Sequence, residues 1–243
     1  MALFSIADLH LSEGKDKPMD VFGSRWRDYT DKLVKNWRAV VTQEDTVVIP
    51  GDVSWGMNLV EALDDFRLIE SLPGKKIIGK GNHDFWWDTL TKMNRFLSEN
   101  GICSVSFLHN NAYDAGEFIV CGTRGWYVEE RYQNTVGDVD YMKIVTREAL
   151  RIETSIKEAT RLSEAAGGKK ILAYFHFPPV FNGFICREIV DVLKKHNVVN
   201  AYFGHIHGTY NVPKTTEYEG IRFTIISADF LNFCPMITAP YDY

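Results

Sequence analysis

The chain contains few cysteines, and their spacing argues against two kinds of structural cross-link. Only 4 of the 243 residues are cysteines, and no two of them form a Cys-x-x-Cys pair. This pattern indicates neither a zinc knuckle nor a dense disulfide framework. We therefore expect reduced thiols, which are typical of the cytoplasm.

Long apolar runs and an excess of basic residues are also lacking. No apolar stretch approaches the roughly 18 residues that cross a membrane, and residues 1–7 lack the basic segment that opens a signal peptide. We therefore expect a cytoplasmic protein without a membrane partner. With 27 basic and 32 acidic residues, the net charge of −5 offers no diffuse positive field, which argues against nucleic acid as a partner.

Apolar periodicity predicts strands that alternate with helices along much of the chain. The predicted strands are residues 3–7, 46–49, 75–78, 104–108, 117–121, 170–175, 198–203 and 222–226. The predicted helices are residues 25–41, 59–72, 86–100, 141–166 and 184–196. No linker or repeat interrupts this pattern, so we predict a single α/β domain over residues 1–243, with a central mixed sheet and helices on both faces.

Histidine, aspartate and asparagine, which are common metal ligands, recur where the predicted strands end. Five of the seven histidines lie in four short motifs, and a fifth motif adds an aspartate: Asp8-Leu9-His10, Gly51-Asp52, Gly81-Asn82-His83-Asp84, His176 and Gly204-His205-Ile206-His207. Binding sites of open α/β sheets lie outside the carboxyl ends of the strands, so these motifs are expected to converge. Residues two apart in a strand face the same side, so each Asp-x-His or His-x-His pair can bind one ion.

The ligand types predict two metal ions and an anionic substrate. We assign Asp8, His10, Asp52 and His207 to one ion, and Asp52, Asn82, His176 and His205 to the other. Imidazole together with carboxylate suits manganese, iron or zinc better than magnesium. Two divalent ions and two aspartates leave a surplus of about two positive charges, which suits the hydrolysis of a phosphate ester by a metal-bridging hydroxide.

Two residues of the third motif remain for catalysis. His83 is not needed as a ligand and is expected to donate a proton to the departing oxygen. Asp84 is expected to orient His83, or to cap a helix that starts near Phe85. Arg124, between Gly122 and Gly125, either contacts the phosphate or is a structural arginine.

The five motifs, in this order over residues 8–207, resemble the calcineurin-like metallophosphoesterase superfamily. The resemblance implies a four-layer α-β-β-α sandwich of two packed mixed sheets, with a dinuclear metal centre at their carboxyl edges. One position differs. Trp55 stands where many members have an arginine or aspartate, so the substrates of those members are not carried over to this chain.

Several alternatives remain open at this point. The predicted enzyme acts on a small phosphorylated substrate, a mono- or diester; the alternatives are a nuclease acting on DNA or RNA, and a metal-stabilised scaffold with little catalytic activity. Trp55, Trp86, Trp87 and Trp126 lie beside motif loops and either stack on a flat substrate group or pack in the core. The segment 126–141 is predicted to be a loop that gates substrate size, or a surface connection remote from the site.

Overall fold

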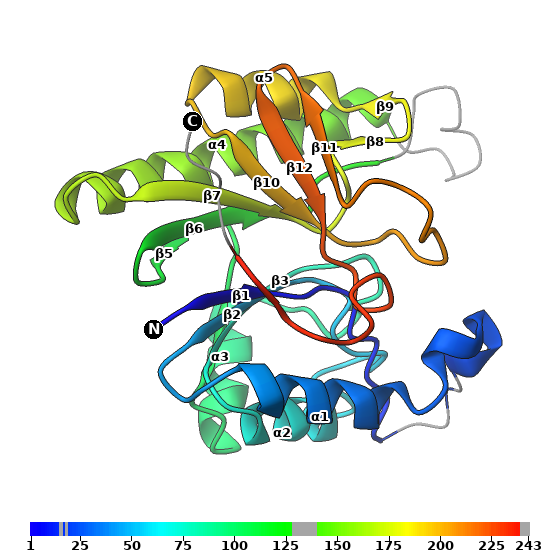
Figure 1. Ribbon diagram of the computed structural model, residues 1–243. Helices are drawn as coiled ribbons and strands as arrows, with labels where there is room; N and C mark the ends of the chain where they lie inside the picture. Colours follow the sequence, from blue (N-terminus) through cyan, green and yellow to red (C-terminus); the bar gives the residue numbers. More distant parts are fainter. Residues whose placement is uncertain (15–16, 18, 128–139, 239–243) are drawn as a thin grey trace.

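The computed structural model describes residues 1–14, 17, 19–127 and 140–238. In this part of the chain, two large mixed sheets face each other, and helices cover the outer face of each sheet (Figure 1). The four-layer α-β-β-α sandwich implied by the family resemblance is therefore confirmed. The periodicity alone predicted one central sheet, which is wrong. An apolar strand looks the same in sequence whether a helix or a second sheet covers its inner face.

The first sheet is formed mainly by the N-terminal half of the chain. Its strands, in spatial order, are β13 (Met236–Ile237), β1 (Leu3–Ser5), β2 (Thr46–Pro50), β3 (Lys75–Gly79) and β4 (Val105–Phe107). Strands β1 to β4 are parallel, and β13 pairs antiparallel with β1. The carboxyl ends of the four parallel strands therefore lie along one edge.

The second sheet is formed by the C-terminal half. Its strands, in spatial order, are β11 (Thr215–Tyr218), β12 (Ile221–Ile225), β10 (Asn200–Phe203), β7 (Lys170–Phe175), β6 (Phe118–Thr123) and β5 (Ala112–Asp114). Strands β12, β10, β7 and β6 are parallel, whereas β11 and β5 are antiparallel edge strands. Thus this sheet also presents a row of carboxyl strand ends.

The described helices divide between the two outer faces. On the first sheet lie α1 (Tyr29–Val40), α2 (Leu63–Ser71) and α3 (Leu90–Glu99), and on the second lie α4 (Tyr141–Ala165) and α5 (Arg187–Lys195) (Figure 1). Two short 3-10 helices, Met19–Phe22 and Ser24–Trp26, precede α1. Within the described residues, no helix has the length and apolar character needed to cross a membrane.

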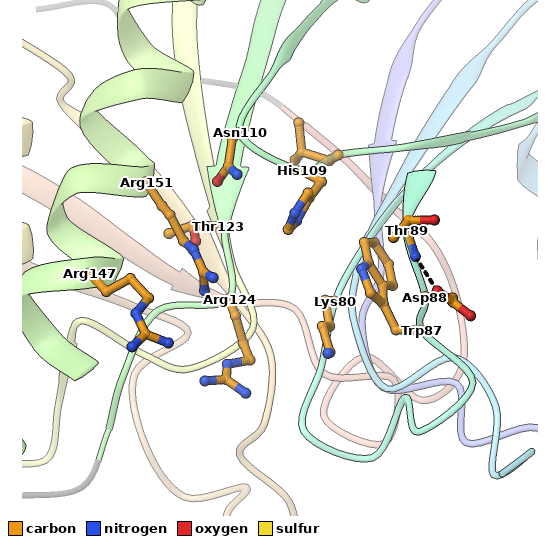
Figure 2. Close-up of a pocket in the computed structure, with 11 residues that line it drawn as sticks. Lys80, Trp87, Asp88, Thr89, His109, Asn110, Thr123, Arg124, Arg147 and Arg151 are labelled. Atoms are coloured by element: carbon orange, nitrogen blue, oxygen red, sulfur yellow. Dashed lines mark hydrogen bonds between the residues drawn. The ribbon is translucent and has the colours of Figure 1, made fainter. Parts of the chain in front are cut away.

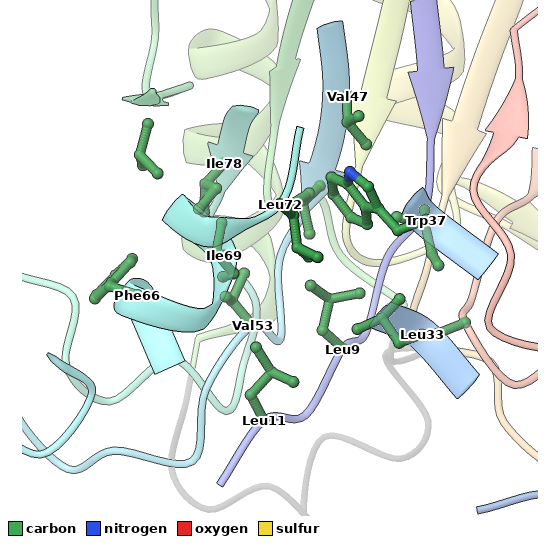
Figure 3. Close-up of a cluster of buried hydrophobic side chains, with 14 of the residues drawn as sticks. Leu9, Leu11, Leu33, Trp37, Val47, Val53, Phe66, Ile69, Leu72 and Ile78 are labelled. Carbon is green, nitrogen blue, oxygen red and sulfur yellow. The ribbon is translucent and has the colours of Figure 1, made fainter. Parts of the chain in front are cut away.

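Along each strand, successive side chains point alternately toward the helices that cover the sheet and toward the other sheet. Val47 and Ile78 pack under the first helical layer with Trp37 and Phe66 (Figure 3), whereas their neighbours in sequence face the second sheet. The interface between the sheets also contains a buried polar contact. The Oγ atom of Ser5 lies 2.9 Å from the hydroxyl of Tyr174 on β7, which links the two sheets.

Four helices begin three or four residues later than the periodicity predicted. The helices predicted to begin at residues 25, 59, 86 and 184 begin at Tyr29, Leu63, Leu90 and Arg187. The last difference has a clear cause. Residues Phe184–Ile185 form β9, which pairs with β8 (Val180–Phe181) across an Asn182-Gly183 turn with positive φ angles of 46° and 85°. Asn-Gly between apolar pairs is a strong hairpin signal, and it overrides the helical period.

Candidate metal centre

The predicted ligands converge at the carboxyl strand ends of both sheets. Asp8 and His10 follow β1, Asp52 follows β2 and Asn82 follows β3, all in the first sheet; His176 follows β7, and His205 and His207 follow β10, in the second. Two groups of ligand atoms lie within 4.8 Å of one another: Asp8, His10 and His207 in one, and Asp8, Asp52 and His176 in the other. Neither sheet forms a complete group by itself.

The first group has the spacing of a metal site. The Nε2 atoms of His10 and His207 are 3.2 Å apart. Two imidazole nitrogens that bind one zinc ion at roughly 2.05 Å in tetrahedral geometry are about 3.3 Å apart. Asp52 Oδ2 lies 3.7 Å from His10 Nε2. The four residues that the sequence assigned to one ion thus lie around a common point.

The second group includes the remaining predicted ligands. His176 Nε2 lies 2.6 Å from the amide oxygen of Asn82 and 3.5 Å from Asp52 Oδ2. The imidazole of His205 is 5.1 Å from that of His176, centroid to centroid. Asp52 therefore lies between the two groups, as predicted for a shared ligand. Asp8 does so as well, since its Oδ1 is 3.4 Å from His176 Nδ1, and the sequence had not indicated this.

Four of the predicted ligands have unusual backbone conformations. The φ angles of Asp8, His10, Asp52 and His205 are 61°, 47°, 52° and 69°. Non-glycine residues rarely adopt this left-handed region, which costs roughly 1 to 3 kcal/mol per residue and is concentrated at functional sites. Backbone hydrogen bonds hold the strained loops, because Asp8 donates to the carbonyl of Gly51 and His10 donates to that of Asp52.

Glycines allow the motif loops to approach one another closely. A Cβ atom on Gly51, whose φ is 104°, would lie 2.5 Å from the amide nitrogen of Gly81. A Cβ atom on Gly204 would lie 2.6 Å from a carboxylate oxygen of Asp8, and one on Gly81 would overlap Asp52 Oδ1. These glycines therefore keep open the space into which the ligand side chains converge.

The electrostatics of the cluster suit a cation. Burial raises the pKa of Asp8 to about 6 and raises that of Asp52 well above its ordinary value. Burial, followed by the neighbouring histidines, lowers the pKa of His10 and His176, so their imidazoles are neutral. Asp8 Oδ1 and His176 Nδ1 are buried without a hydrogen-bond partner in the described structure. Buried carboxylates beside neutral imidazoles are a ligand set that a divalent ion would satisfy.

The sequence reasoning missed Asp229, a residue that supports a ligand. Its buried carboxylate lies 2.9 Å from His207 Nδ1 and also accepts hydrogen bonds from the Gly208 amide and the Tyr210 hydroxyl. Burial lowers the pKa of His207, but the hydrogen bond to Asp229 and the charge of Asp8 outweigh it, and the net shift is upward. Asp229 follows the last strand of the second sheet, the position that marked the other site residues.

The predicted acid, His83, lies beside the ligand cluster without joining it. Its ring is half-buried, 5.7 Å from that of His10 and 4.5 Å from that of Trp55. Among the described residues its imidazole makes no hydrogen bond, whereas its backbone amide donates to Asp52 Oδ1. Trp55 stacks on His10 at 4.9 Å and so packs against both imidazoles. Trp55, the position at which the motifs depart from the family they resemble, thus places an indole beside the cluster.

The roles predicted for Asp84 require correction. Its carboxylate accepts hydrogen bonds from the backbone amides of Asp52, Val53 and Gly81 and from the indole of Trp86. No hydrogen bond joins it to His83 in the described structure. It does not cap a helix either, because α3 begins after Thr89, whose side chain accepts from the Lys92 amide. Asp84 instead ties the loop after β2 to the loop after β3, with both oxygens already occupied.

The remaining predicted residues lie around the cluster. Arg124 lines a separate neighbouring pocket, and its contact with phosphate stays a prediction. Trp86 and Trp126 are buried in the core, and Trp87 lines the same pocket as Arg124. Of the segment predicted to gate the site, residues 128–139 lie outside the described residues.

Comparisons with known proteins agree with this architecture. A crystal structure of TT1561 from Thermus thermophilus aligns with a TM-score of 0.55 at 11% identity, over 97% of each chain. The structure of AQ665, a protein of unknown function from Aquifex aeolicus, aligns with a TM-score of 0.50 at 15% identity, over 97% of this chain and 95% of the other. At such identities the likeness concerns the fold alone. No curated protein gave a significant sequence match.

A model of the calcineurin-like phosphoesterase family matches residues 1–209. This match includes the strand ends that present Asp8, Asp52, Asn82, His176 and His207. It extends over most of the chain, which therefore belongs to the calcineurin-like phosphoesterase family.

Proposed function

We propose that this protein hydrolyses a phosphate ester of a small molecule with the help of two divalent metal ions. The observation that carries the proposal is the convergence of Asp8, His10, Asp52, His176 and His207 from two sheets into two adjoining groups. Two adjacent ions suit this reaction, because together they bind phosphate oxygens and supply a hydroxide nucleophile at neutral pH. The mixture of imidazole, carboxylate and amide ligands favours manganese, iron or zinc.

The protein's own residues contribute positioning and proton transfer. Asp229 holds His207 in one orientation, and Asp84 holds the backbone at Asp52. His83, with no hydrogen bond to its imidazole from the described residues, is placed to donate a hydrogen bond or proton to the leaving oxygen. The contact between Trp55 and His83 restricts the orientation of that imidazole.

The net charge of −5 favours a small substrate over a nucleic acid. All four cysteines are free, which supports action in the cytoplasm. A scaffold without catalysis is the remaining alternative. It is disfavoured because the ligand side chains and His83 are present together in one cluster.

The proposal is tested with protein stripped by a chelator and then supplied with manganese, iron, zinc or magnesium separately. Each sample is assayed on mono- and diester model substrates. We expect hydrolysis that depends on added metal and is abolished by Asp52→Asn, with Asp31→Asn, at an exposed position of α1, as the matched control. Failure of every metal-loaded sample on a broad panel would support the scaffold alternative.

A further inference from the structure

A pocket opens beside the candidate metal centre, with a volume of about 510 Å³. Figure 2 shows its two opposing walls. Lys80, Trp87 and His109 line the wall on the side of the first sheet, and Arg124, Arg147 and Arg151 line the wall formed by β6 and α4. Four lysine and arginine side chains thus surround one cavity, although the protein as a whole is acidic.

The positive charge of this pocket is only partly neutralised. Asp88, the one acidic residue in its described lining, is already engaged, since its carboxylate lies 2.9 Å from Lys92 Nζ. Arg151 pairs with the buried carboxylate of Glu148. Lys80, Arg124 and Arg147 have no ion pair with any residue in the described ranges.

Arg124 has a hydrogen-bond donor that the described structure leaves unsatisfied. Its Nε atom is buried and lacks a hydrogen-bond partner in the described structure. Burial lowers the pKa of Arg124, and burial followed by the charge of Arg124 lowers the pKa of Lys80. Gathering these cations costs free energy that an anion in the pocket would offset.

The pocket is joined to the metal centre through the backbone. Lys80 precedes Asn82 by two residues, so their Cα atoms are at most about 7.6 Å apart. On the opposite wall, the backbone carbonyl of Arg124 accepts a hydrogen bond from the amide of the ligand His176 at 3.1 Å. The two walls of the pocket therefore lie directly beside two of the predicted ligands, Asn82 and His176.

We propose that this pocket binds a second phosphate group of the substrate, so that the enzyme acts on small molecules that carry two phosphates. This substrate class rests on the proposed phosphoesterase function, whereas binding of an anion in the pocket does not. Guanidinium groups bind phosphate through paired charge-assisted hydrogen bonds, and three arginines with one lysine provide such donors. The pocket volume of about 510 Å³ is of the size that holds a small ligand.

The pocket itself is tested by calorimetry with inorganic pyrophosphate and protein kept metal-free by a chelator. We expect Arg124→Gln and Arg147→Gln each to weaken binding about tenfold or more, the effect of one lost charge-assisted hydrogen bond. Arg147 is exposed on α4, so its replacement should leave the fold intact. Arg147→Gln therefore still tests the pocket if Arg124→Gln fails to fold. Arg38→Gln, the same change at an exposed position of α1, should bind as the wild type does. The assignment would be overturned if pyrophosphate did not bind, or if Arg38→Gln lost as much affinity as the two pocket variants.

The substrate class is tested with the metal-loaded enzyme on nucleoside and sugar bisphosphates, on the matching monophosphates and on oligonucleotides of increasing length. We expect kcat/KM to be at least about tenfold higher for a bisphosphate than for the matching monophosphate. Arg147→Gln should lower kcat/KM for the bisphosphate more than it lowers kcat/KM for the monophosphate. Equal rates would overturn the two-phosphate class, and rates that rise with oligonucleotide length would replace it with nucleic acid. If no ester is hydrolysed, the proposed function fails, while pyrophosphate binding still decides the pocket.

Discussion

The Nδ1 atom of His207 lies 2.9 Å from the buried carboxylate of Asp229, whereas the Nε2 atom of the same ring faces His10. A carboxylate in this position fixes the orientation of a metal-binding imidazole and raises its basicity. Asp229 therefore acts as a positioning residue, although it does not face the proposed ions. The structure also explains how it reaches the site, because Ser227 bridges to Ala7, next to the ligand Asp8.

Replacing Asp229 by Asn should weaken metal binding by about 10- to 100-fold without removing a ligand. The asparagine amide carries no negative charge, so it would no longer raise the basicity of the His207 imidazole. Equilibrium dialysis over a series of metal concentrations would measure the change, with Asp31→Asn, at an exposed position of α1, as the control. Wild-type affinity in Asp229→Asn would show that the contact does not support metal binding.

Gly81→Ala should remove metal binding while the protein remains folded. The new Cβ atom would overlap both Oδ1 and the backbone nitrogen of Asp52, and so displace the proposed shared ligand. Metal content after gel filtration and a circular dichroism spectrum are sufficient to test this. Gly14→Ala is the control, because its Cβ atom would make only ordinary contacts at 3.6 Å. Full metal content in Gly81→Ala would show that the loop after β3 accommodates the new methyl group without displacing Asp52.

His83→Ala should retain both metal ions and lower the maximal rate by about two to four orders of magnitude. The loss should be smaller for esters with good leaving groups, since these need less protonation. Rates on a series of substituted phenyl phosphates, compared with metal content, would check both points. Loss of metal from the variant would instead identify His83 as a ligand.

Asp8→Asn should stabilise the metal-free protein at neutral pH, although it removes a ligand. Burial raises the pKa of Asp8 from 3.8 to about 6, so between these values the folded chain retains a proton that the unfolded chain has released. The free energy of unfolding therefore falls as pH rises through this window and stays reduced above pH 6. We expect Asp8→Asn to be more stable than the wild type by roughly 1 to 3 kcal/mol at pH 7, with no difference near pH 3.5.

Urea titrations in the presence of a chelator at the two pH values would measure this difference. The same variant should lose the stabilisation that added metal gives the wild type. A variant that is less stable than the metal-free wild type at pH 7 would show that the ionised carboxylate of Asp8 is not destabilising.

Much of the candidate site could be predicted from the sequence, because five of the parallel strands, β1, β2, β3, β7 and β10, are short apolar runs followed within a few residues by a predicted ligand. Asp8, Asp52 and His176 are examples of this order. The convergence of the motifs follows from the shared direction of the strands. The distribution of strands over two sheets could not be predicted from periodicity, because apolar side chains such as Val48 and Leu172 face the other sheet rather than a helix.

Other features depend on contacts between residues far apart in the chain. Asp229 meets His207 only because the end of the second sheet bridges back to the first. Arg147 and Arg151 reach the basic pocket because α4 packs on the sheet beside Arg124. The single motif Gly81-Asn82-His83-Asp84 suggested that Asp84 serves its neighbour His83, whereas its carboxylate binds backbone amides on another loop. The prediction of one domain over residues 1–243 stays a prediction.

Metal titration into stripped protein, with bound metal and ester hydrolysis measured on the same samples, tests the central claim most directly. The geometry of two adjoining ligand groups predicts that hydrolysis rises as the second equivalent of metal binds, up to two ions per chain. Full hydrolysis with a single bound ion, or hydrolysis that persists in the stripped protein, would contradict the account.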